Sequence, residues 1–172
     1  MKDFLQLASD RFSVRAYQDT PVEKEKIDLI LDAAKKAPTA CNYQPQKIYA
    51  VIDEEKRKAL AAVSPCTFNA PVIFVVGYDS TRSAKGRVCE GHDFGDTDAA
   101  IVCTHMMLEA ADLGLGSCWV GYFKENDVRA ALGIDETIRI RDLLPVGYPA
   151  EGAVPSAMHE KCRADDDMIT IL

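Results

Sequence analysis

The sequence lacks any apolar run of the length that a membrane-spanning helix requires, which is about 20 residues. Its first residues, MKDFLQLASDRF, also lack the hydrophobic region of a secretory signal. Basic residues are in the minority, because 20 Lys and Arg face 27 Asp and Glu and the formal net charge is −7. A protein that binds duplexes usually has the opposite balance. We therefore expect a cytoplasmic protein whose partners are neither membranes nor nucleic acids.

Cysteines paired at metal-binding or redox spacing are also absent. The six cysteines are scattered without a CxxC pair, and a chain of 172 residues buries enough apolar surface to fold without disulfides. We therefore expect free thiols. The nearest approach to a zinc pattern is Cys89-x-x-His92 followed by Cys103-x-His105. The second pair falls within an apolar helical pattern, where a one-residue gap points the side chains to different faces, so no metal site is expected.

Several common catalytic motifs are missing as well. The chain has no Walker loop, no HExxH and no GxSxG. The full GxGxxG fingerprint is also absent, because Cys118-Trp119 follows Gly114-x-Gly116 and Trp119 stands where the third glycine would be. These absences argue against the usual sites for nucleotide hydrolysis, zinc-dependent proteolysis, serine hydrolysis and dinucleotide binding.

The apolar pattern predicts helices and strands along one chain without repeats or linkers, hence a single domain over residues 1–172. Thr20-Pro21-Val22-Glu23 resembles a capping box with proline at the first helical position, so a helix is predicted to start there and to stop before Pro38. Further helices are predicted over residues 54–63, 96–113 and 126–132, and strands over residues 46–52, 71–76, 117–123 and 138–148. The strand 71–76 is apolar throughout, which indicates burial on both faces.

Three other segments have distinctive patterns. The helix 96–113 is apolar nearly all round, which is typical of a helix in a core or an interface. Residues 78–95 lack periodicity and contain three glycines, so we expect a long functional loop. The tail from about residue 150 is loose and acidic but ends in the apolar residues MITIL. Such an end needs something to pair with: either a second copy of the chain, as a swapped arm, or the chain's own sheet.

Basic side chains gather in two short segments of this acidic chain. Arg11 and Arg15 flank Ser13 near the N-terminus, and Lys161 and Arg163 lie in the tail. Guanidinium groups form charge-assisted and often bidentate hydrogen bonds with anions, and a serine hydroxyl adds a donor. Each segment alone is also compatible with solvated surface. An anion site is expected only if the fold brings them together.

Two further segments have groups suited to a flat heteroaromatic ligand. Residues 37–46, APTACNYQPQ, are rich in hydroxyl and amide groups, which offer donors and acceptors to the edge of a ring. An ordinary connection between a helix and a strand is the alternative. Residues 114–121, GLGSCWVG, allow the main chain to approach such a ligand closely, although Gly114 also suits a helix end and Trp119 also suits a core.

In their order along the chain, these segments resemble the nitroreductase family of flavin enzymes. The resemblance rests on residues 11–15, 38–45 and 114–121 and on the segment LPVGYP at residues 144–149, and it extends from Arg11 to Arg163. It implies an α+β fold in which helices flank a mixed sheet. It also implies a homodimer in which the C-terminal arm, about residues 150–172, is swapped between subunits, with FMN at their interface.

The resemblance also implies which residues bind FMN. Arg11 is the expected contact to the ring, whereas Arg15 and Arg163 are expected at the phosphate. The complete implied set is Arg11, Phe12, Ser13, Arg15, Pro38, Thr39, Ala40, Asn42, Gln44, Leu115, Gly116, Ser117, Lys161 and Arg163. No side chain is expected to be catalytic, because the flavin performs the redox chemistry.

Three positions depart from the family pattern. Phe12 stands where a second arginine is common, so its contact is expected through the backbone. Thr39 replaces the usual serine and keeps the hydroxyl, whereas Gln46 replaces an aromatic residue and alters the wall of the pocket.

The implied activity is the transfer of electrons from NADH or NADPH to nitroaromatics, quinones or similar electron-poor acceptors in a ping-pong cycle. Alternatives within the family are reductive dehalogenation, enoate reduction and flavin fragmentation. A non-enzymatic protein that stores or senses flavin is an alternative from another class, and so is a dimeric domain whose arginines only cover its surface. Residues 78–95 are where the choice of acceptor is expected to lie.

Overall fold

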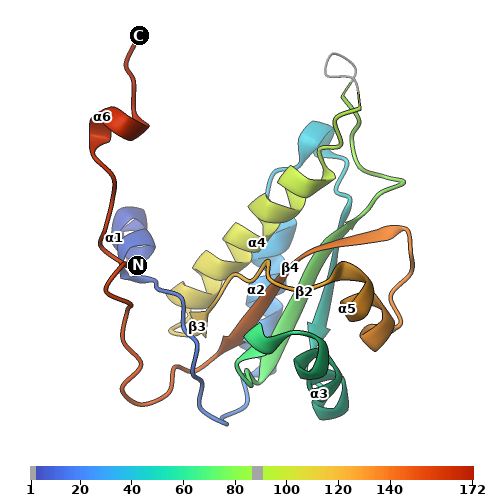
Figure 1. Ribbon diagram of the computed structural model, residues 1–172, viewed down its shortest axis with the longest axis horizontal. Coiled ribbons are helices and arrows are strands. Elements are labelled where there is room, and N and C mark those ends of the chain that lie inside the picture. The colour runs from blue at the N-terminus through green and yellow to red at the C-terminus, as the bar shows by residue number, and fades with distance from the viewer. Residues whose placement is uncertain (1–2, 87–90) are drawn as a thin grey trace.

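A computed structural model describes residues 3–86 and 91–172, and its helices and strands follow one another as shown in Figure 1. The helices and strands in this part of the chain are α1 (Phe4–Asp10), α2 (Lys24–Lys36), β1 (Gln46–Val51), α3 (Glu54–Val63), β2 (Val72–Asp79), α4 (Gly95–Asp112), β3 (Gly116–Ser117), α5 (Glu125–Leu132), β4 (Ile138–Gly147) and α6 (Asp165–Met168). Short 3-10 helices lie at Ala40–Asn42 and Pro65–Thr67.

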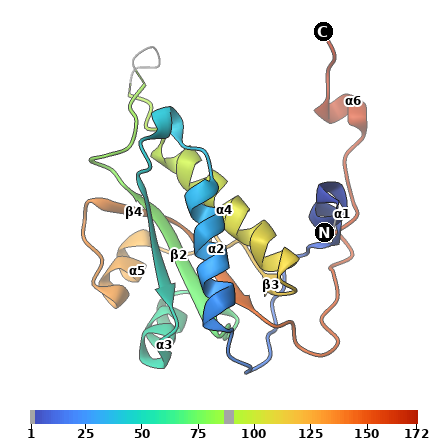
Figure 2. The ribbon, with the colours of Figure 1, turned by 180° about the vertical axis from the view of Figure 1, so that it is seen from behind.

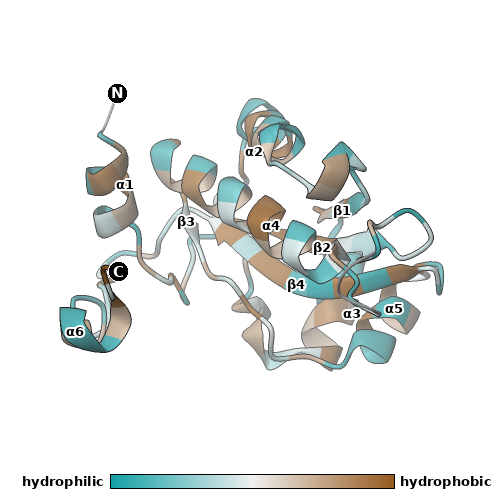
Figure 3. Cartoon of the chain, turned by 90° about the horizontal axis from the view of Figure 1, so that it is seen from above, coloured by the Kyte–Doolittle hydropathy of each residue, from teal (hydrophilic) through white to brown (hydrophobic). Residues whose placement is uncertain are grey.

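The strands form one antiparallel sheet in the order β1-β2-β4-β3, with helices on both of its faces. Along β2 the side chains alternate between two cores. Phe74 and Val76 pack with α2 and α4, whereas Ile73 and Val75 pack with α3 and α5. Figure 3 shows these layers from above. The predicted α+β fold and the burial of β2 on both faces are thus confirmed. The sheet itself was expected to be mixed, whereas its four strands all pair antiparallel.

The predicted start of the first long helix was wrong. Helix α2 begins at Lys24, and the side chain of Glu23 caps nothing. Instead, the Glu23 carboxylate accepts a hydrogen bond of 2.9 Å from the hydroxyl of Tyr148, which lies just beyond β4. A tertiary contact therefore replaces the local capping box that the sequence predicted. The predicted end of this helix before Pro38 is confirmed.

The strand predicted over residues 117–123 is much shorter in the structure. Only Gly116 and Ser117 form β3, and one further bridge pairs Val120 with Leu143. Between these pairs, Cys118 donates its backbone N–H to the carbonyl of Pro145 at 3.2 Å. Proline has no N–H to return, so the regular ladder is interrupted at this position.

Helix α4 lies centrally in the layer above the sheet, as Figure 3 shows. It buries Val102 and Met106 completely, while Ile101 and Leu108 on another side are only half-buried. This pattern agrees with the prediction of a core or interface helix. Within residues 3–86 and 91–172, no helix is long and apolar enough to cross a membrane.

The C-terminal tail leaves the sheet after β4 and passes beside α1, as Figures 1 and 2 both show. Its apolar end does not pair with the sheet of its own chain, because Met168 ends the short α6 and Ile169, Ile171 and Leu172 are largely exposed. The alternative that the tail folds back on its own sheet is therefore wrong. Docking on a second copy stays a prediction.

Candidate functional site

The basic segment at residues 11–15 lies against the glycine-containing segment that follows α4. Val14 is buried and donates its N–H to the carbonyl of Ser117 at 2.9 Å, and Ser13 forms a parallel bridge with the same residue. A Cβ at Gly116 would lie 2.6 Å from a methyl carbon of Val14. Two of the segments identified in the sequence, about a hundred positions apart, are thus in direct contact, and the lack of a side chain at Gly116 permits it.

Arg11, Ser13 and Arg15 line one cavity of about 210 Å³, whose other wall comes from the C-terminal tail. The tail contributes Ser156, Met158 and His159, which precede Lys161 and Arg163. Lys161 and Arg163 are exposed and do not line this cavity. Within one chain, therefore, the N-terminal arginines lie beside the tail. The two basic side chains of the tail, Lys161 and Arg163, do not join them in this cavity.

His159 attaches the tail to the N-terminal segment at this cavity. The sequence analysis did not identify this residue. Its Nε2 lies 2.9 Å from the carbonyl oxygen of Ser9 at the end of α1, and its ring packs edge-on against Phe12 with 6.3 Å between the centroids. Its place two residues before Lys161 was the only signal available in the sequence.

The cavity has the charge that an anion requires. Within the described part of the chain, neither Arg11 nor Arg15 takes part in an ion pair. The Arg15 guanidinium donates a hydrogen bond of 3.3 Å to the carbonyl of Ser13. Two guanidinium groups without carboxylate partners, with a serine between them, fit a phosphate monoester carrying about −1.5 to −2 charges.

Cys118 lies beside these cations but is not positioned to act as a nucleophile. It is 4% exposed, and burial raises the pKa of its thiol, although Arg15, Ser13 and Arg11 lower that pKa to a smaller extent. The thiol therefore stays protonated at neutral pH.

The amide-rich loop at residues 38–44 has an ordered and unusual backbone. Cys41, Asn42 and Gln44 all adopt positive φ angles, of 53°, 54° and 49°. The Gln44 N–H donates to Thr39 Oγ1 at 3.1 Å, and the Gln44 side-chain amide donates to Asn42 Oδ1 at 3.1 Å. Both amide side chains are exposed, so this loop presents its polar groups outward.

A buried carboxylate that sequence analysis missed attaches this loop to α4. Asp98, in the first turn of the helix, accepts a hydrogen bond of 2.8 Å from the N–H of Ala40 and is only 2% exposed. An acidic residue near the start of an apolar helix was the available signal, because carboxylates there interact favourably with the helix dipole.

The two sets of site residues lie at opposite ends of α4. Asp98 and the loop are at its N-terminal end, whereas Leu115, Gly116 and Ser117 follow its C-terminal end. The helix has 18 residues and is therefore about 27 Å long. Figure 1 shows both ends. The arginine cavity and the loop of one chain therefore lie far apart and do not enclose a single small ligand.

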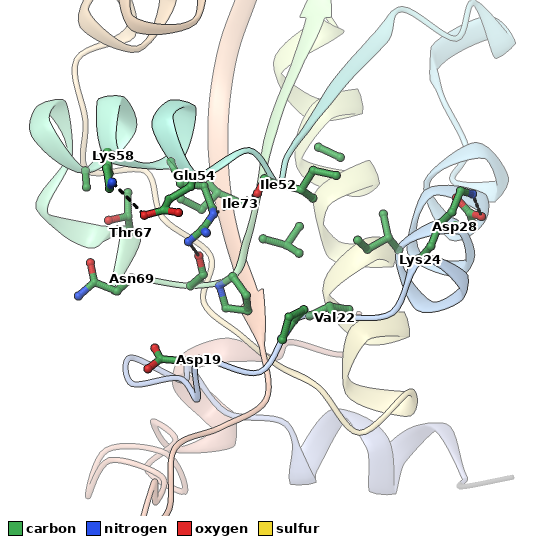
Figure 4. Close-up of a pocket in the computed structure, with 18 residues that line it drawn as sticks. Asp19, Val22, Lys24, Asp28, Ile52, Glu54, Lys58, Thr67, Asn69 and Ile73 are labelled. Atoms are coloured by element: carbon green, nitrogen blue, oxygen red, sulfur yellow. Dashed lines mark hydrogen bonds and ion pairs between the residues drawn. The ribbon is translucent and has the colours of Figure 1, made fainter.

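A larger groove lies elsewhere, between α2 and α3 beside the C-terminal end of β1. It has a volume of about 800 Å³, and Figure 4 shows Val22, Ile52 and Ile73 around it, with the ion pair of Glu54 and Lys58 on one side. Two more cavities, of about 320 and 610 Å³, adjoin other residues of β1. The three cavities together adjoin residues of β1 from Gln46 to Val51.

No metal centre accompanies these features in the described residues, among which no cluster of three or more His, Cys, Asp or Glu side chains could hold an ion. Cys89 of the weak zinc pattern lies outside those residues. Cys103 is fully buried, and His105 Nδ1 is 2.9 Å from the carbonyl of Ile101. The five cysteines that the structure describes are free, as predicted.

Comparison with known proteins identifies the family. The family model described as "Nitroreductase family" matches residues 8–69 and 64–148. The chain belongs to the nitroreductase family. The resemblance inferred from the sequence motifs is thereby confirmed.

Solved structures and curated relatives agree with this membership. A nitroreductase family protein from Clostridium difficile 630 is 34% identical, with a TM-score of 0.91 and 98% of each chain covered. An FMN-dependent nitroreductase from Clostridium difficile R20291 is 27% identical, with a TM-score of 0.79 and 98% of each chain covered. A Bacillus subtilis protein named FMN reductase [NAD(P)H] is 29% identical over 170 residues, which span 90% of this chain and 65% of the relative.

We expect Gly116→Ala to destabilise this nitroreductase family member. The new methyl group would clash with the buried side chain of Val14 and lie 3.1 Å from Pro149, and such overpacking costs about 1–3 kcal/mol. The free energy of unfolding measured in urea tests this. Gly121→Ala is the matched control, because a Cβ there meets nothing within 4 Å and a change within about 0.5 kcal/mol is expected. Equal stability of the two variants would contradict the prediction.

Proposed function

We propose that this chain is an FMN-dependent oxidoreductase that transfers electrons from NADH or NADPH to an electron-poor acceptor such as a nitroaromatic or a quinone. The observation that carries the proposal is the cavity lined by Arg11, Ser13 and Arg15, where neither guanidinium has a carboxylate partner within the described residues and both are available to an anionic ligand. Membership of the nitroreductase family supports it, as do relatives named as an FMN reductase and an FMN-dependent nitroreductase.

In this proposal the chain's residues bind and orient the cofactor rather than react with substrate. Bound FMN would supply the redox chemistry, with donor and acceptor using the same cleft in turn. Arg15 and Ser13 hold the phosphate, and Arg11 contacts the ring, where a cation stabilises developing negative charge. Leu115, Gly116 and Ser117, which Val14 holds beside the arginine segment, are proposed to contact the ring through their main chain.

The proposed active unit is a homodimer of single-domain subunits. The separation of the two half-sites by the length of α4 supports it, because the loop at residues 38–44 would reach the flavin held by the partner's arginines. In the same arrangement, the exposed end of the tail, residues 168–172, would pair with the open edge of β1 in the partner. In the described chain that edge adjoins three cavities, which leaves room for another strand.

Acceptor selection is proposed to lie with the segment between β2 and α4. Its described part is held by an ion pair and a β-bridge between Lys85 and Asp93, and the rings of His92 and Phe94 pack edge-on with 4.5 Å between their centroids. Residues 87–90 lie outside the described part. Such a segment beside a cleft can exclude water or clamp an acceptor.

The cytoplasm is the proposed compartment. The five described cysteines are free, as expected for a protein kept in a reducing environment.

Absorbance spectroscopy of the purified protein tests the proposal. Bands of oxidised flavin in the near-UV and blue are expected, and NADH or NADPH should bleach them under anaerobic conditions. Bound flavin that neither nucleotide reduces would favour the storage function or a different electron donor. A colourless protein that does not bind added FMN would refute the proposal.

A further inference from the structure

Asp98 is the side chain that joins the amide-rich loop to the helical core. Its Oδ1 accepts the N–H of Ala40 at 2.8 Å, across 58 positions of sequence. Its Oδ2 is buried without a hydrogen-bond partner in the described part of the chain. Burying a carboxylate costs free energy unless its polar contacts compensate. The hydrogen bond to the loop and the N-terminal end of α4 are the compensating contacts that the structure shows.

The loop needs such an attachment, because its backbone is one that residues with a Cβ seldom adopt. Cys41, Asn42 and Gln44 are left-handed, and none of them is glycine. Short-range hydrogen bonds to Thr39 and Asn42 shape the loop, and the buried Ala37 and Pro45 hold its two ends on the core. Between those ends, the bond from Ala40 to Asp98 attaches the loop to α4. A loop held in advance does not have to be ordered when a ligand binds.

We propose that Asp98 is a positioning residue, which holds the loop at residues 38–44 in the conformation that receives the flavin ring. The inference rests on the proposed function, in which this loop contacts the ring. Asp98 itself is buried and touches the loop, so it acts on the ligand only through the backbone of Ala40.

The experiment compares Asp98→Ala with Asp98→Asn in the full-length protein. Asp98→Ala removes the acceptor and is expected to weaken FMN binding at least tenfold, as measured by fluorescence titration. It is also expected to change the visible circular dichroism of the flavin that remains bound, because the ring then lies in a less ordered environment. Asp98→Asn keeps a carbonyl oxygen for Ala40, so binding within threefold of the natural protein is expected. Thermal unfolding of both FMN-free variants shows how much stability is lost.

A second variant removes the other partner of the hydrogen bond. Ala40→Pro has no N–H, and its predecessor Thr39 is extended, with φ −132° and ψ 156°, which suits a residue before proline. We expect Ala40→Pro to weaken FMN binding like Asp98→Ala. Combining the two changes should weaken it no further than the worse single change, because both break the same bond.

Several results would overturn the inference. One is that Asp98→Ala leaves the FMN affinity and the flavin dichroism unchanged. Another is that Asp98→Asn and Asp98→Ala lose equal amounts of FMN affinity. A third is that the losses of affinity add up in the double variant. If Asp98→Ala does not fold, normal FMN binding by Ala40→Pro overturns it and at least tenfold weaker binding supports it. A natural protein that binds no FMN would instead refute the proposed function, so the two failures are distinguishable.

Discussion

A chain that ends at Ala164 is expected to elute as a monomer and to lose its flavin. Residues 165–172 include the exposed apolar end of the tail, where Ile171 is 94% exposed and Leu172 is fully exposed. Exposed side chains contribute little to the stability of their own subunit, so the truncated monomer should remain folded. It would lack the dimer contacts, and each phosphate cavity would lack the loop of a partner. Size-exclusion chromatography with detection of protein and flavin absorbance measures both effects.

The matched control for this truncation keeps the apolar end and removes only the charges before it. Replacing Asp165, Asp166 and Asp167 by Asn leaves residues 168–172 intact, and all three side chains are exposed. This variant should remain a yellow dimer. A truncated protein that still elutes as a yellow dimer would show that the arm does not hold the subunits together.

Arg15→Ala is expected to weaken FMN binding by more than about 1.5 kcal/mol, or over tenfold, because a charge-assisted hydrogen bond to the phosphate is lost. Arg15 lines the cavity and has no carboxylate partner in the described chain, so its charge is available to a ligand. Fluorescence titration of FMN into the FMN-free protein measures the effect. Arg139→Ala is the control, since Arg139 is an exposed arginine of β4 outside this cavity.

The same change at Arg163 tests whether the tail supplies a cation to the phosphate. Arg163 does not line the cavity of its own chain, although Ser156, Met158 and His159 just before it do. We expect Arg163→Ala also to weaken FMN binding by more than about 1.5 kcal/mol. Unchanged affinity in both Arg15→Ala and Arg163→Ala would mean that the phosphate binds elsewhere.

Most helices and strands were predictable because their signals are local. The apolar run of β2 and the nearly all-round apolar pattern of α4 each follow from neighbouring residues, and the structure confirms both. Strand β2 runs to Asp79, three residues beyond its predicted end, and so includes the first two residues of the predicted loop 78–95. The two larger errors lie where a residue distant in sequence makes a contact. The Glu23 carboxylate accepts a hydrogen bond from the Tyr148 hydroxyl and makes no helix cap. At Cys118 the hydrogen-bond ladder of the sheet is interrupted, because its partner Pro145 has no N–H. Neither partner is close in sequence to the segment that it affects.

The candidate site was only partly predictable, for the same reason. Residue types in three short segments indicated an anion and a flat ring, and they were sufficient to indicate the family. Asp98 and His159 were not predicted, because each one contacts a backbone group that is far away in sequence. Asp98 binds the N–H of Ala40, and His159 lies against the carbonyl of Ser9.

The chemistry of the site and the element types follow from the order of residues, because charge, hydrogen-bonding capacity and apolar periodicity are properties of short stretches of chain. The placement of the segments does not follow from that order. Packing alone brings Val14 against Gly116 and sets the loop at residues 38–44 at the far end of an 18-residue helix. Both placements depend on contacts between residues that are far apart in the sequence, and such contacts exist only in the folded chain.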